Sequence, residues 1–115
     1  MRSALFLLAG VLLLVTAGYH MTGQSEVGSW MDGRQGNIIA ALWLAPSLAW
    51  AAVGAFWIYH AFSERSPSWA TVLVTASVPL SLAIPLAVMV DPFHPGVYML
   101  LASGALALLA KKRLS

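Results

Sequence analysis

Four long stretches of the chain, 4–19, 38–62, 69–90 and 96–110, contain no Asp, Glu, Lys or Arg. Hydrophobic residues make up 60% of the 115 residues, more than a soluble domain of this size could bury. A lipid bilayer solvates apolar side chains, and an α-helix satisfies its own backbone hydrogen bonds there. The sequence therefore predicts an all-α integral membrane protein, built as an antiparallel bundle of four transmembrane helices.

The predicted helices cover approximately residues 4–21, 38–62, 69–90 and 96–110, within a single membrane domain over residues 1–115. Residues 22–37 are mostly polar and include four glycines, so they are predicted to form a loop. The next connection, residues 63–68, is short enough to make the second and third helices antiparallel neighbours. The last connection contains Pro92 and Pro95, which restrict it to a rigid turn.

The first apolar stretch allows two interpretations. Arg2 precedes an apolar run that ends in the small-residue sequence 15–17, Val-Thr-Ala, as in a cleaved signal peptide. The same run, with Tyr19 at the headgroup level, also fits an uncleaved transmembrane helix. We favour the uncleaved helix, because its loss would leave three helices and place the N-terminus outside.

The basic residues set the predicted orientation. With the N-terminus inside, five basic side chains face the cytoplasm: Arg2, Arg65, Lys111, Lys112 and Arg113. Only Arg34 faces outwards, and such a bias in short segments is the positive-inside signal of inner-membrane proteins. We therefore expect both termini in the cytoplasm. The formal net charge is only +2, so the lipid bilayer rather than nucleic acid is the expected partner, together with further copies of the chain or a larger membrane complex.

The most unusual pattern is the seven-residue spacing of Trp43, Trp50 and Trp57, which places three indoles along one face of the second predicted helix. Trp50 falls near the middle of the membrane, where its N–H needs an acceptor. We expect this acceptor to be a hydroxyl on the third helix. The stripe predicts packing against a neighbouring helix, a groove for a lipid, quinone or other apolar ligand, or an interface with another protein. Ser77 and Ser81 are the further lining residues expected for a ligand groove.

Histidine and carboxylate side chains on the outer side suggest a metal site. In the predicted topology His20, Asp91 and His94 lie there, and these side-chain types are common metal ligands. Their spacing matches no metal-binding signature, and His60 lies on the opposite side. No histidine pair occupies the apolar stretches at matching depth, so haem is not expected, and no cofactor is predicted.

The same outer surface is predicted to close over the bundle. The segments 22–37 and 91–95 are expected to form one joined cap, because the first and fourth helices are short and leave room for it. Arg34 is the only basic side chain on this side, and an ion pair with Asp91 or Asp32 would order the glycine-rich loop.

The absence of chemical motifs limits the predicted functions. The chain has no cysteine and no catalytic motif, and no Asp, Glu, Lys or Arg lies inside its apolar stretches, where coupled transporters and pumps normally carry one. We therefore expect no enzymatic activity and a structural or accessory role in a membrane complex. The alternative is a small transporter or binder of an apolar or lipid-like molecule that uses the tryptophan-lined face. An electron-transfer subunit is the third possibility.

Overall fold

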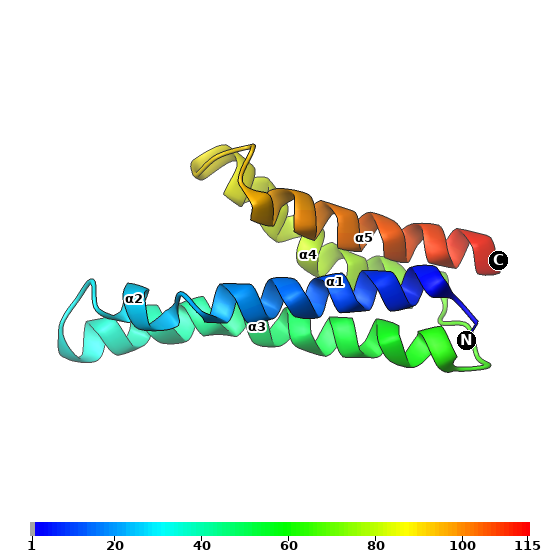
Figure 1. The fold of residues 1–115 in the computed structure, drawn as a ribbon, viewed down its shortest axis with the longest axis horizontal. Helices are drawn as coiled ribbons and strands as arrows, with labels where there is room; N and C mark the ends of the chain where they lie inside the picture. The colour runs from blue at the N-terminus through cyan, green and yellow to red at the C-terminus, as the bar shows by residue number, and fades with distance from the viewer. Residues whose placement is uncertain (1) are drawn as a thin grey trace.

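The computed structural model describes residues 2–115, which form helices and no strands. The long helices are α1 (Ala4–Met21), α3 (Gly33–Phe62), α4 (Trp69–Met89) and α5 (Pro95–Leu114), and the short helix α2 (Gln24–Gly28) follows α1 (Figure 1). Three stretches are long and apolar enough to cross a membrane: Ala4–Gly28, Gly33–Phe62 and Trp69–Met89. The prediction of an all-helical chain with transmembrane-type helices is confirmed.

Helix α3 is longer than predicted, and the predicted loop before it is largely helical. The helix begins at Gly33 rather than at residue 38, after the short helix α2. Two glycines permit this arrangement. Gly33 adopts a left-handed backbone with φ 58° at the turn into α3. A Cβ atom on Gly36 would lie 2.5 Å from the carbonyl oxygen of Gly28, so the backbone of α2 packs directly on the first turns of α3.

The long helices are arranged as two pairs. Helix α1 packs on α3 along much of its length, α4 packs on α5, and α1 also contacts α5. Helices α3 and α4 touch much less, although their connection is short, because α1 packs against both α3 and α5. The two pairs lie side by side near the chain ends and diverge towards the α4–α5 turn (Figure 1). The prediction that α3 and α4 pack as close neighbours is therefore wrong over most of their length.

The contact between α1 and α3 depends on two glycines. A Cβ atom on Gly10 would lie 2.5 Å from the carbonyl oxygen of Gly54, and one on Gly54 would lie 2.9 Å from the carbonyl oxygen of Gly10. Small residues of this kind let two membrane helices approach closely and gain van der Waals contact. Fully buried Phe6, Leu13 and Trp57 fill the core on either side of this crossing.

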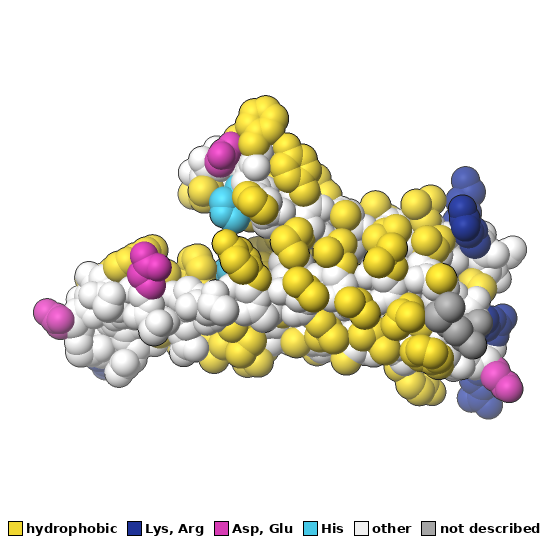
Figure 2. All heavy atoms as spheres, viewed as in Figure 1, with side chains coloured by type: hydrophobic (Ala, Val, Ile, Leu, Met, Phe, Trp, Pro, Cys, Tyr) yellow, Lys and Arg dark blue, Asp and Glu magenta, His cyan; other side chains and the backbone are white. Residues whose placement is uncertain are grey.

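One end of the molecule gathers the ends of α3 and α5 and the start of the chain. The backbone N–H of Arg2 donates to the carbonyl of Ala61 at 2.7 Å, and Arg2 shares a small cavity with Arg113. Lys111 donates to Ser66 Oγ at 3.4 Å. Figure 2 shows most of the Lys and Arg side chains at this end, whereas most of the acidic side chains lie towards the other end.

The predicted outer cap does not form. Helix α2 packs along α3, whereas the α4–α5 turn leans away from both helices. Figure 2 shows a notch between this turn and the α2–α3 part of the molecule. Asp91 accepts a hydrogen bond at 2.9 Å from the backbone N–H of Phe93 and so orders its own turn. The cap is absent because α3 carries α2 outwards along its extra turns, away from the α4–α5 turn.

We expect Gly10→Ala to destabilise the bundle by about 1–3 kcal/mol, because the added methyl group must displace the backbone of Gly54. Thermal unfolding in detergent micelles, followed by circular dichroism, measures the loss. The matched control is Gly18→Ala in the same helix, where nothing lies within 4 Å of the new Cβ atom. Equal stability of the two variants would contradict the close crossing of α1 and α3.

Candidate functional site

A large cavity occupies the space between the diverging helix pairs. Its volume is about 780 Å³, within the range of about 300–1,000 Å³ that is usual for small-molecule sites. Residues of α1, α3, α4 and α5 and of the segment around α2 form its wall. Histidine side chains lie on both sides of the notch in Figure 2 that opens into this space. The cavity is the principal candidate site of the described chain.

The inner wall of the cavity is apolar. Helix α4 contributes four residues of its second half and the following cap: Leu82, Pro85, Leu86, Met89 and Val90. Helix α5 adds Leu100, and α3 adds Pro46 and Trp50 on the opposite side. Such a wall offers no charge to a ligand and favours hydrocarbon.

An imidazole held between two indoles forms the most ordered part of the site. The ring of His20 stacks on Trp43, with ring centres 4.2 Å apart and planes 8° from parallel, and meets Trp50 edge-on at 5.1 Å. His20 Nδ1 shares a hydrogen bond of 2.8 Å with Ser47 Oγ. The indole N–H of Trp43 donates to the backbone carbonyl of His20 at 2.7 Å. These contacts fix His20, at the end of α1, against the face of α3.

Trp50 is buried among protein side chains, as predicted, but its predicted hydrogen bond is wrong. The residue is only 4% exposed, and its indole N–H has no hydrogen-bond partner in the described chain. A hydroxyl group of α4 bonds to Trp57 instead. The indole N–H of Trp57 donates to Thr75 Oγ1 at 3.0 Å. Helices α3 and α4 lie close enough for this contact near their connection, and the two helices diverge further along (Figure 1).

The five ligand candidates of the sequence divide into two groups. Trp43 and Trp50 line the cavity, whereas Trp57 is fully buried in the core. Ser77 and Ser81 lie on the exposed face of α4, away from the cavity, and donate to the carbonyls of their own helix. The structure therefore does not bring these serines to the tryptophan stripe, since that face of α4 points away from α3.

The structure does not group the three metal candidates in one place. His20 and His94 both line the cavity, but Asp91 does not. His94 Nδ1 accepts a hydrogen bond of 3.0 Å from the backbone N–H of Gly96 and caps α5. Among residues 2–115 no three His, Asp or Glu side chains are grouped so that they could hold a metal ion.

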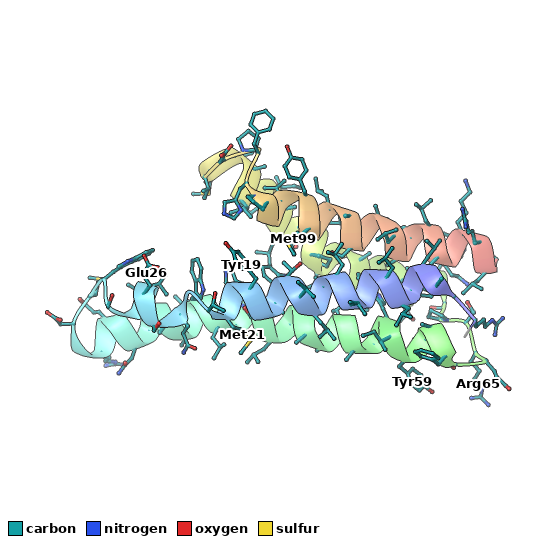
Figure 3. The ribbon with its side chains drawn as sticks, viewed as in Figure 1. Tyr19, Met21, Glu26, Tyr59, Arg65 and Met99 are labelled. Atoms are coloured by element: carbon teal, nitrogen blue, oxygen red, sulfur yellow. The ribbon has the colours of Figure 1, made fainter. Side chains whose placement is uncertain are left out.

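The mouth of the cavity contains residues that the sequence did not single out. Tyr19 and Trp30 are 66% and 64% exposed, and Glu26 is also exposed. Figure 3 shows Tyr19 and Glu26 pointing to the side on which the α4–α5 turn rises. In the sequence, Glu26 and Trp30 look like ordinary residues of an exposed loop. The packing of α2 on α3 is what brings them to the same cavity as Tyr19.

The function of the site has to be inferred from its own residues, because no protein-family profile, curated protein or solved structure matches this chain.

We expect Trp57→Phe to destabilise the protein by about 0.5–1 kcal/mol more than Trp50→Phe does. The first change removes the hydrogen bond to Thr75, and hydrogen bonds between membrane helices contribute about this much. The second removes an N–H group that has no hydrogen-bond partner among residues 2–115. Unfolding of both variants in the same detergent measures the difference. A larger loss for Trp50→Phe would show that the N–H of Trp50 is satisfied in the native membrane.

Proposed function

We propose that this chain is a four-span inner-membrane protein that binds an apolar, lipid-like molecule in the cavity between its helix pairs. The observation that carries the proposal is the cavity itself, which combines a volume of about 780 Å³ with an apolar inner wall. A ligand would lie with its hydrocarbon part against α4 and its polar end near His20 and the mouth. The proposal assigns binding and release to the protein, without a chemical reaction on the ligand.

The shape of the cavity supports an amphiphilic ligand. The two helix pairs diverge towards the α4–α5 turn (Figure 1), and the notch between this turn and the end of α1 opens at the wide end (Figure 2). Trp43 and His20 place hydrogen-bonding groups at the wide end, while the narrow end towards Leu100 is apolar. Ligand sites between the helices of bundles commonly combine an apolar wall with a few polar groups in this way.

The distribution of charge supports four spans with both termini in the cytoplasm. Helix α5 is 20 residues long and carries its only charges, Lys111, Lys112 and Arg113, in its last turn. These side chains lie at the same end as Arg2 and the α3–α4 connection (Figure 2). Basic residues at one end of a helical membrane protein favour the cytoplasmic side for that end. The cavity would then open in the outer half of the membrane.

An apolar ligand is expected to bind saturably to the purified protein in maltoside micelles, at about one copy per chain. The probe is a radiolabelled monoacylglycerol, which is neutral and lipid-like. The Leu86→Trp variant should bind it at least tenfold more weakly, a change of about 1.4 kcal/mol, because the larger side chain fills the cavity. The matched control is Leu73→Trp on the exposed face of the same helix, which should bind normally.

Native mass spectrometry of detergent-extracted protein complements this test. A co-purified lipid that is lost only in Leu86→Trp supports the proposal. If the probe binds both variants equally, or does not bind the parent, the proposal is wrong. A bound protein subunit in place of a lipid would favour the accessory role in a membrane complex, with the partner's helix in the cavity.

Single cysteines are expected to report the orientation, since the chain has no cysteine of its own. Phe93→Cys, in the α4–α5 turn, should react with an impermeant thiol reagent in intact cells. Glu64→Cys, in the α3–α4 connection, should react only after the cells are permeabilised. The opposite pattern, or equal labelling of both positions in intact cells, would exclude the proposed topology.

A further inference from the structure

The polar residues of the cavity form an unusual set. None of its lining residues is Lys or Arg, although residues 2–115 include all six basic side chains of the chain. Its only charged residue is Glu26. The remaining polar lining residues are histidine, threonine and aromatic residues, and two of them, Tyr19 and Trp30, are largely exposed. The mouth therefore carries one carboxylate and no Lys or Arg side chain.

Three side chains of this mouth, Glu26, Trp30 and Tyr19, favour a positive charge on the ligand. A carboxylate attracts a cation by about 1 kcal/mol at 4 Å even in water, and more strongly where apolar walls displace water. The faces of Trp and Tyr carry negative partial charge and attract ammonium groups, most of all quaternary ones. An anionic head group, such as a phosphate, would find no Lys or Arg side chain in the lining and would lie near Glu26.

We infer that the ligand of this cavity is a cationic amphiphile, with a quaternary-ammonium-type head between Glu26, Trp30 and Tyr19 and an apolar tail along α4. This inference rests on the proposed function and specifies its ligand class. The apolar residues Leu86 and Leu100 lie deeper in the same cavity and receive the tail. The mouth selects the head group and the inner wall selects hydrocarbon.

A series of ligands with the same tail and different heads tests the charge directly. The probes are radiolabelled dodecyltrimethylammonium, dodecanol and dodecanesulfonate, each measured with the intact protein in uncharged maltoside micelles and corrected for partitioning into empty micelles. The buffer is held at pH 8, where an ordinary imidazole is neutral. We expect the cation to bind about tenfold more tightly than the alcohol, and the sulfonate to bind more weakly than either.

The variant Glu26→Gln should lower the affinity for the cation about fivefold and leave the affinity for the alcohol unchanged. The matched control is Asp32→Asn, which removes an exposed carboxylate from the segment between α2 and α3, outside the cavity. Trp30→Leu retains apolar surface but removes the aromatic face, so it should also weaken binding of the cation alone. Helical content and thermal unfolding of each variant confirm that the fold is intact.

The outcomes separate this inference from the proposed function. Equal binding of cation and alcohol, or an unchanged cation affinity in Glu26→Gln, overturns the cationic head group and leaves the apolar site standing. Tighter binding of the sulfonate overturns it as well. A fivefold loss in both Glu26→Gln and Asp32→Asn would mean that general surface charge attracts the cation, which also contradicts the inference. If none of the three probes binds, the cavity is not a ligand site and both proposals fail.

Discussion

Where α1 crosses α3, backbone meets backbone. The carbonyl oxygen of each glycine, Gly10 and Gly54, lies within 3 Å of the position that a Cβ atom on the other would take. In a bilayer no hydrophobic effect drives two helices together, so such close van der Waals packing has to hold them. The contact also fixes the relative position of the two helices along their axes, because a shift of one turn would bring larger side chains into the crossing. The rest of the α1–α3 interface follows from this register.

The candidate site is one consequence of that register. His20 lies ten residues beyond Gly10 on α1, and Trp43 and Ser47 lie eleven and seven residues before Gly54 on α3. Antiparallel helices joined at the two glycines must therefore bring His20 against this part of α3. There the imidazole stacks on Trp43 and shares a hydrogen bond with Ser47, which satisfies polar groups that would otherwise be costly in an apolar setting. One wall of the cavity is thus held by the same contact that holds the fold.

The sequence predicted the helices better than it predicted their contacts. Charge-free stretches mark membrane helices regardless of tertiary structure, so α1 and α4 were located to within a residue or two. The start of α3 was missed, because its first residues are polar and only their packing under α2 makes them helical. The stripe of Trp43, Trp50 and Trp57 was correctly placed on one face, but spacing alone could not show that α4 reaches Trp57 and not Trp50. The two glycines of the crossing were the signal that would have predicted the position of His20.

The second wall of the cavity is built differently. Gly104 accepts the side chain of Leu80 so closely that a Cβ atom there would lie 2.7 Å from Leu80 Cγ, and this contact holds α4 to α5. Beyond it, Pro85 lacks an N–H group, so α4 loses a backbone hydrogen bond where it lines the cavity.

The second half of α4, which lines the cavity, therefore packs on α5 and lies apart from α1 and α3. The hydroxyl groups of Ser77 and Ser81 are occupied by carbonyls of their own helix, which explains why they can face an apolar environment without serving the site. One wall of the cavity, formed by α1 and α3, is thus held by the glycine and imidazole contacts. The opposite wall is the part of α4 in which Pro85 interrupts the helical backbone hydrogen bonds. The space between them results from two separate helix pairings, which among residues 2–115 are joined mainly by the contact of α1 with α5.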